Sequence, residues 1–197
     1  MLLKQLRTNN QRTYEVEWKF SRDSFCLAHF TDDDKERDKA FEDGKSAGKA
    51  AMQLEPNKVD GYFWYGANLG EQADRSPVTV GITAVNEIRD VMTKAAAIDP
   101  TYELASPYDV LGRLELETDM MGGTPEKALE FLQKALAIEK NNGNTHLDMA
   151  EAYLALKNPA EAKKHIEYVL TMKPSPGYEP EYDEQVTKAK QLLRSRF

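Results

Sequence analysis

The stretch that decides the fold is PEKALEFLQKALAIEKNNGNTHLDMAEAYLALKNPAEAKKHIEYVLTMKP, residues 125–174. Within it, a small, a bulky and a second small residue recur after 34 positions: Ala128, Leu132 and Ala135 return as Ala162, Ile166 and Val169. Spacings of four and three place each set on one face of an α-helix. The stretch therefore predicts two amphipathic helices of one kind. Between them, residues 143–156 predict a helix of a second kind, with Ala150 and Tyr153 on its inner face.

A period of 34 residues with this pattern is typical of a tetratricopeptide repeat (TPR), in which each repeat is a helical hairpin. Two antiparallel helices cannot bury their apolar faces alone, so successive hairpins stack and share one core. We therefore predict an all-α fold, a right-handed α-solenoid of TPR type with about four hairpins and a C-terminal capping helix.

Extending the same register along the chain gives the other units. We expect hairpins at residues 14–56, 57–100, 104–140 and 141–174, followed by a capping helix at about 178–195. Residues 1–197 then form a single domain. Leu2, Leu3 and Leu6, followed by Asn9 and Asn10, resemble the last turns of a helix whose start is missing. We therefore expect the sequence to be part of a longer protein.

The first hairpin carries unusually small residues at its inner positions, Gly44, Gly48 and Ala51. They predict a close approach between helices. The same run, GKSAGKA at 44–50, is similar to a phosphate-binding loop. It is one residue short of that motif, however, and Ala50 stands where a magnesium-binding hydroxyl is needed. The sequence therefore favours close packing over nucleotide binding.

The second hairpin has two unusual features, a run of four aromatic residues at 62–65 and an insertion. Pro56 and Pro100 are 44 positions apart, ten more than one repeat, and the surplus falls in QADRSPVTVGI at 72–82. Apolar Val78 and Val80 and the stiff Pro77 predict an ordered loop packed on the aromatic run. Four consecutive aromatic residues cannot all face the repeat core. The spare ones either pack against this loop or line a pocket for a ligand or partner.

The third hairpin has six extra residues, which we place in YELASP at 102–107. The second helices of the last two hairpins have clear starts. Thr124 and Asn158 are expected N-caps, and Pro125 and Pro159 follow at the first helical position.

Few residues suggest chemistry. His29, His146 and His165 are far apart in sequence and lack a metal-binding motif, and Cys26 is the single cysteine. We therefore expect no metal, no cofactor and no catalytic residues, so the protein is not expected to be an enzyme. A net charge of −7 argues against a nucleic-acid partner, which needs a basic surface. No stretch is long and apolar enough to span a membrane.

Binding is the better-supported function. The first helices of stacked hairpins line an extended groove suited to a peptide or partner helix. The register places these candidate binding residues there: Asp60, Phe63, Ala67, Asp109, Arg113, Glu117, Asn144, Leu147 and Glu151. The aromatic run beside the 72–81 loop adds Trp64 as a further candidate. We predict a non-enzymatic scaffold or adaptor that binds a protein or peptide. The alternative is a carrier of a small hydrophobic ligand, held beneath the 72–81 loop.

Beyond the repeat, the chain shows a YFWYG helix at 62–66, a long loop ending in VGI, AAAIDP at 95–100 and LGRLELE at 111–117. This order resembles the regulator-of-microtubule-dynamics proteins and their bacterial relatives over about residues 57–195. It also resembles the T-component lipoproteins that accompany TRAP transporters. The first resemblance implies an adaptor. The second implies contact with a transporter solute-binding protein and a hydrophobic ligand path, although no lipid-attachment cysteine lies near the start. A cytoplasmic and a bacterial periplasmic location both stay open.

Overall fold

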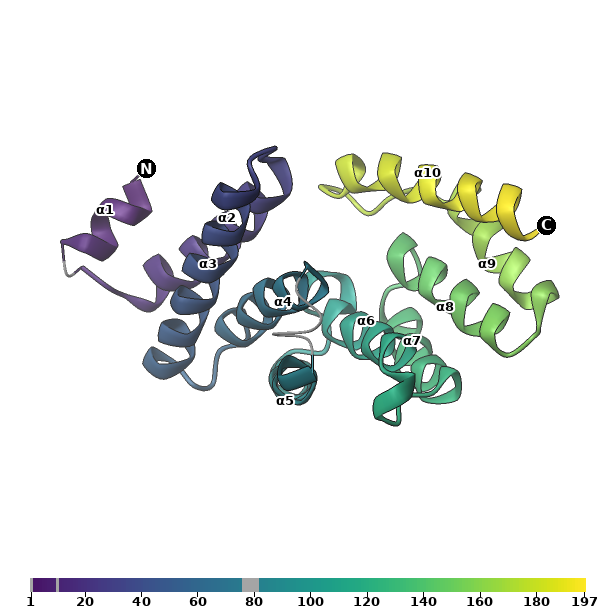
Figure 1. Ribbon diagram of the computed structural model, residues 1–197, viewed down its shortest axis with the longest axis horizontal. Helices are drawn as coiled ribbons and strands as arrows, with labels where there is room; N and C mark the ends of the chain where they lie inside the picture. The colour runs from purple at the N-terminus through teal and green to yellow at the C-terminus, as the bar shows by residue number, and fades with distance from the viewer. Residues whose placement is uncertain (1, 10, 76–81) are drawn as a thin grey trace. The chain divides into compact units, whose positions relative to one another are not determined.

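The computed structural model describes residues 2–9, 11–75 and 82–197, and these form ten α-helices, one short 3-10 helix and no strand (Figure 1). The elements are α1 (Leu2–Thr8), α2 (Tyr14–Phe30), α3 (Asp34–Leu54), α4 (Val59–Arg75), α5 (Ile82–Ile98), α6 (Tyr102–Glu117), η2 (Asp119–Met121), α7 (Pro125–Ile138), α8 (Gly143–Ala155), α9 (Pro159–Thr171) and α10 (Glu179–Arg196). The predicted all-α class is confirmed.

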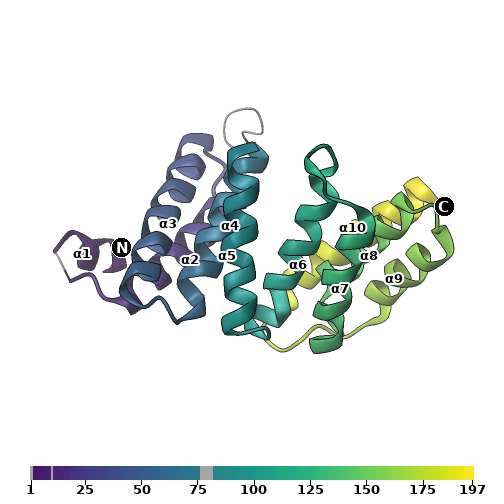
Figure 2. The same cartoon turned by 90° about the horizontal axis from the view of Figure 1, so that it is seen from below.

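The helices group into two compact units, which we call the N-terminal unit (Met1–Asp99) and the C-terminal unit (Pro100–Phe197). In the N-terminal unit, α2 packs on α3, α3 on α4 and α4 on α5, and Figure 2 shows α3, α4 and α5 side by side. In the C-terminal unit each helix from α6 to α9 packs on the next one. The pairs α2–α3, α4–α5, α6–α7 and α8–α9 are the hairpins of the predicted fold. That all 197 residues form a single domain stays a prediction.

The core of the C-terminal unit is built from the predicted repeat positions. Ala128, Leu132 and Ala135 of α7 are fully buried, as are their equivalents Ala162, Ile166 and Val169 of α9. Both helices also begin as predicted. Thr124 Oγ1 accepts a hydrogen bond from Lys127 N at 3.2 Å, and Asn158 Oδ1 accepts one from Glu161 N at 3.3 Å. These caps satisfy backbone donors that a helix start leaves free.

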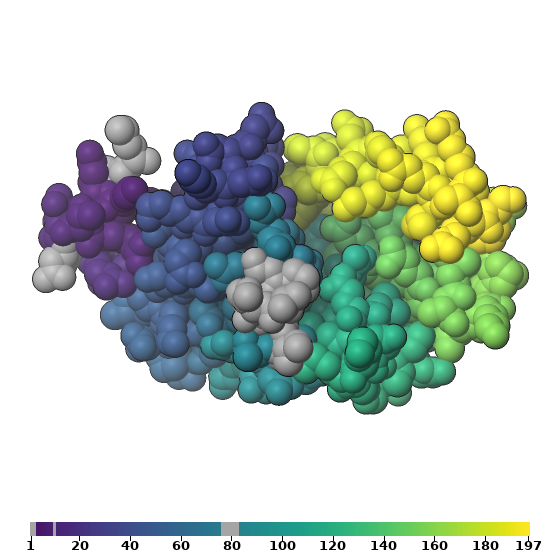
Figure 3. All heavy atoms as spheres, in the orientation of Figure 1, coloured from purple at the N-terminus to yellow at the C-terminus, as the bar shows by residue number. Residues whose placement is uncertain are grey.

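The last helix, α10, closes the apolar core of the C-terminal unit. It packs against both α8 and α9, and Figure 3 shows it in yellow beside the green α8 and α9. Ala189 is the fully buried contact of α10 and belongs to the same apolar cluster as Ile166 and Val169. This helix therefore serves as the C-terminal cap of the predicted fold.

Small residues bring α3 close to α4, as predicted. A Cβ atom added to Gly48 would lie 2.8 Å from Tyr65 Cα, nearer than real Cβ contacts. Ala51 is fully buried, and Gly44 is buried beside the Asn68 side chain. The GKSAGKA run lies inside α3, so its glycines serve helix packing.

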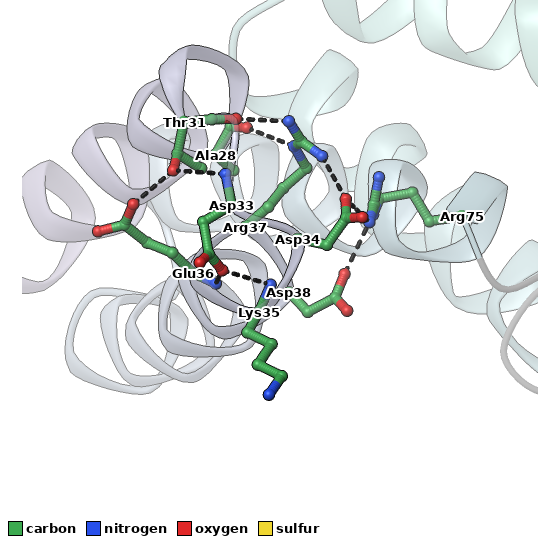
Figure 4. Close-up of polar contacts among 9 residues, drawn as sticks. All are labelled: Ala28, Thr31, Asp33, Asp34, Lys35, Glu36, Arg37, Asp38 and Arg75. Carbon is green, nitrogen blue, oxygen red and sulfur yellow. Dashed lines mark hydrogen bonds and ion pairs between the residues drawn. The ribbon is translucent and has the colours of Figure 1, made fainter.

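The C-terminal end of α4 differs from the sequence prediction. Residues 72–75, expected in a loop, continue the helix as far as Arg75. Arg75 donates to Asp38 Oδ1 at 3.1 Å and to Asp34 Oδ1 at 3.0 Å (Figure 4). These ion pairs bind the end of α4 to the start of α3. The local sequence pattern could not predict them, because the partners lie 37 and 41 positions away in sequence. The predicted packing of Val78 and Val80 lies outside the described residues.

The insertion expected at 102–107 forms a left-handed turn at the start of α6. Glu103, Leu104 and Ala105 have φ angles of 45°, 60° and 64°. Such angles disfavour residues other than glycine, so the turn needs support from its surroundings. Asn142 Nδ2 donates to Leu104 O at 3.1 Å, and Tyr178 Oη donates to the Glu103 carboxylate at 2.6 Å. The inserted residues are thus held by Asn142, which is the N-cap of α8, and by Tyr178 in the segment that leads into α10.

Candidate protein-binding face

Five charged residues lie along the facing sides of α6 and α8, and we call them the Arg113 cluster. They are Asp109, Arg113 and Glu117 of α6 with Asp148 and Glu151 of α8. Arg113 Nη1 lies 2.9 Å from Asp148 Oδ1 and 3.5 Å from Glu151 Oε2. Arg113 Nε also donates to Glu117 Oε1, one helical turn further along α6. The guanidinium therefore connects the first helices of two successive hairpins.

Burial divides the cluster into a covered half and an open half. Asp148 is buried, and Asp109 is half-buried with its Oδ1 shielded from solvent. The side chains of Arg113, Glu117 and Glu151 keep 47%, 37% and 43% of their surface exposed. These three can therefore contact a partner.

The covered carboxyls have unusual acidities. Burial raises the pKa of Asp109 to about 6, although the Thr145 hydroxyl and Arg113 work against the shift. Burial also raises the pKa of Asp148 well above its usual range, and the neighbouring Asp109 adds to the effect. Burial lowers the pKa of Arg113, but Asp148 and Glu117 outweigh this loss and raise it overall. The guanidinium therefore stays charged.

The sequence gives ten candidate binding residues, and those on α6 and α8 differ in their exposure. Asp109, Arg113, Glu117 and Glu151 come together in the Arg113 cluster, which also contains the unpredicted Asp148. Asn144 is exposed at the start of α8. The prediction that Leu147 faces the groove is wrong. Leu147 is 5% exposed and belongs to the apolar cluster containing Ala189, because α10 packs on α8.

The candidates on α4 are mostly covered. Phe63 and Trp64 are 6% and 8% exposed, and Ala67 is half-buried. The Trp64 ring lies 5.6 Å from that of Phe25, because α2 packs against α4. Asp60 accepts a hydrogen bond from Tyr14 Oη, also on α2. The prediction that Phe63 faces an open groove is therefore wrong for the described N-terminal unit, and the Trp64 candidate is covered as well.

Sequence reasoning missed a pair of histidines in the C-terminal unit. His146 Nδ1 of α8 and His165 Nδ1 of α9 are 2.8 Å apart, although 19 positions separate them in sequence. His146 Nε2 lies 2.9 Å from Lys140 O, and its ring stacks on Tyr168. Both histidines lie in the predicted hairpin at 141–174, so the pairing of its two helices could have predicted that the rings are neighbours. Among the described residues, no group of three or more His, Cys, Asp or Glu side chains could hold a metal ion.

Comparison with known proteins decides the family. The model of the family "Regulator of microtubule dynamics protein 1-3" (RMD1-3) matches residues 1–195, nearly the whole chain. The chain belongs to the RMD1-3 family. This confirms the first resemblance seen in the sequence, whereas the resemblance of this RMD1-3 chain to transporter T-components stays a prediction. A comparison with curated protein sequences finds no match.

Solved structures confirm the TPR-type solenoid fold of this RMD1-3 chain. TTC0263, a thermophilic TPR protein from Thermus thermophilus, is 19% identical with a TM-score of 0.69, covering 98% of this chain and 88% of that one. One MamA structure is 18% identical with a TM-score of 0.54, covering 91% and 97%. Another is 22% identical with a TM-score of 0.55, covering 82% and 92%. At these identities the likeness concerns the fold alone.

No helix among the described residues of the RMD1-3 chain is both long and apolar enough to cross a membrane.

Proposed function

We propose that this protein is a non-enzymatic scaffold that binds a protein partner through the open half of the Arg113 cluster. The observation that carries the proposal is the position of Arg113, Glu117 and Glu151. All three are exposed, and they project from the first helices of two successive hairpins, which in TPR-type folds line the binding side. The fold and the family are consistent with a role in protein–protein interaction.

The charge of this face indicates the chemistry of the partner. Four carboxylates surround one guanidinium, so the face has an acidic excess even if one buried carboxyl is protonated. A partner segment carrying lysine or arginine fits this excess, because complementary charge favours encounter and register. The covered Asp148 holds Arg113 in place, so the face does not have to order itself when the partner binds.

The carrier alternative is not part of this proposal. It rests on aromatic side chains of α4, and Phe63 and Trp64 are covered by neighbouring helices in the described N-terminal unit. A transporter solute-binding protein as the partner likewise stays a sequence-based prediction.

The test is a quantitative pull-down with a charge-reversed face. Glu117→Lys/Glu151→Lys changes two exposed side chains that do not support the core. The matched control, Glu130→Lys/Glu167→Lys, makes the same charge change on the second helices α7 and α9. Proteins captured from cells expressing the native gene are compared by mass spectrometry, after both variants show the wild-type melting temperature. We expect at least one partner to be retained by the control and lost from the face variant. An identical set of partners for both variants would contradict the proposal.

A further inference from the structure

The N-terminal unit has a cavity of about 260 Å³ whose lining is basic. Lys4 and Arg7 of α1 contribute to it, together with Arg12 of the following linker and Lys39 of α3. The remaining lining includes the ring of Phe20 and one carboxylate, Asp43. A basic lining is unexpected in this protein, which has 33 acidic and 26 basic residues.

The two arginines are held by one buried carboxylate. Glu17 is fully buried and accepts hydrogen bonds from Arg7 Nε at 3.0 Å and from Arg12 Nε at 2.7 Å. The Arg7 guanidinium also lies over the Phe20 ring, 4.5 Å from its centre. Both guanidinium groups are therefore fixed through their Nε side. Among the described residues, the two Nη atoms of Arg7 and Nη1 of Arg12 donate to no protein group, so these donors are available to a ligand.

The charges around the cavity do not balance. One arginine is enough to neutralise Glu17, and Lys39 is paired with Asp43 at 3.0 Å. The second arginine and Lys4 are left without a carboxylate of their own in the described part of the chain. Planar guanidinium groups bind oxyanions through paired N–H donors, and lysine adds a mobile point charge. The arrangement has the donors and the excess positive charge that a phosphate group requires.

We propose that this cavity is a binding site for an oxyanion of the phosphate type. Arg7 and Arg12 supply oriented N–H donors, and Lys4 supplies an additional positive charge. Lys39 lines the cavity as an ion pair with Asp43. The volume is several times the roughly 30 Å³ of a water molecule, enough for a phosphate group with part of its hydration. A free phosphate compound and a lipid headgroup share this chemistry, so the experiment has to distinguish them.

The first experiment is a titration of the ¹⁵N-labelled protein with inorganic phosphate, with sodium chloride at equal ionic strength as the reference. Saturable amide shifts are expected at Lys4, Arg7, Arg12 and Lys39. The variant Lys4→Gln/Lys39→Gln leaves the Glu17 ion pairs intact. It is expected to weaken binding about tenfold or more, because it removes two positive charges from the lining and leaves the Asp43 carboxylate unpaired. The matched control, Lys163→Gln/Lys190→Gln, removes two exposed lysines from the C-terminal unit and is expected to bind phosphate as the wild type does.

The second experiment identifies the source of the phosphate group. Sedimentation with phosphatidylcholine vesicles is compared in the presence and absence of a phosphatidylinositol phosphate. Binding of soluble phosphate alone assigns the site to a free phosphate compound, whereas vesicle binding that is lost in Lys4→Gln/Lys39→Gln assigns it to a lipid headgroup. The proposal is overturned if neither probe binds, or if the control variant loses binding as much as the cavity variant does.

Discussion

His146 Nδ1 lies 2.8 Å from His165 Nδ1, so the two imidazoles share one hydrogen bond across the last hairpin. His146 Nε2 faces the carbonyl of Lys140 at 2.9 Å, and a carbonyl only accepts, so this nitrogen carries the hydrogen. In neutral His146, Nδ1 is then the acceptor and His165 Nδ1–H is the donor. Protonation of both imidazoles would set two N–H groups against each other, so the hydrogen bond requires that at least one of the two rings is neutral.

This geometry predicts loss of stability in acid. Burial lowers the pKa of His146, and burial together with His146 lowers the pKa of His165 to about 4, with Glu161 opposing and Lys164 adding to the shift. Below about pH 6.5 the unfolded chain binds protons that the folded histidine pair does not bind, because folding lowers the pKa of both imidazoles. The stabilisation is therefore complete above pH 6.5 and is lost as the pH falls toward 4. Because His165 is only partly buried, we expect a loss on the order of 1–2 kcal/mol.

The measurement is urea unfolding between pH 4 and 7.5 for the wild type and His165→Asn. The Asn amide can still donate to His146 but does not titrate, so the difference in unfolding free energy between the two proteins should shrink as the pH falls. His29→Gln changes an exposed histidine and serves as the control. A difference that is constant with pH would refute this account of the histidine pair.

The Asp109 carboxyl predicts the opposite pH dependence, a stability that falls as the pH rises. Its pKa is raised to about 6 by burial, so the folded protein binds a proton that the unfolded chain releases above about pH 3.8. The stabilisation that the protonated Asp109 carboxyl provides is therefore complete in acid, and it is lost as the pH rises through 6. At pH 7 the charged group is a cost, and Asp109→Asn should raise the unfolding free energy by about 1–2 kcal/mol. At pH 4 the gain should vanish, and equal gains at both pH values would be evidence against a raised pKa.

Ala162→Glu tests the repeat register. Ala162 is fully buried between α8 and α9, so a glutamate there buries an unpaired carboxylate. We expect a loss of about 3–5 kcal/mol in unfolding free energy, measured by urea denaturation. Ala160→Glu lies two positions earlier on the exposed start of the same helix and should change stability by less than about 0.5 kcal/mol. Similar stability of the two variants would show that the register is wrong.

A pair of glycines tests the close approach of α3 and α4. A methyl group at Gly48 would meet the Tyr65 backbone, and we expect Gly48→Ala to destabilise the protein by about 1–3 kcal/mol. Gly70 of α4 has no atom within 4 Å of an added Cβ. Gly70→Ala should therefore stabilise the protein by about 0.5–1 kcal/mol, through the higher helix propensity of alanine. Thermal melts followed by circular dichroism compare the two. If Gly48→Ala were also stabilising, the helices would be further apart than described.

The candidate binding face was partly predictable. Residues 109, 113 and 117 are four apart, so they share one side of α6 whatever surrounds it. Asp148 was missed because nothing local distinguishes it from other acidic residues of α8. It matters only because α6 and α8 are neighbours, which brings it to Arg113 across 35 positions of sequence.

The sequence by itself determined the elements that depend on near neighbours. The spacing of Ala128, Leu132 and Ala135 fixes the buried side of a helix, and Thr124 and Pro125 fix where that helix starts, because these effects act within one or two turns. The tertiary structure alone decided which remaining faces are covered. Trp64 is buried because α2 lies against α4, Leu147 is buried because α10 lies against α8, and His146 meets His165 across a hairpin. Such coverage depends on contacts between helices that are far apart in sequence. The periodicity of a single helix predicts which face packs in its own hairpin, but not which other helix covers the rest of its surface.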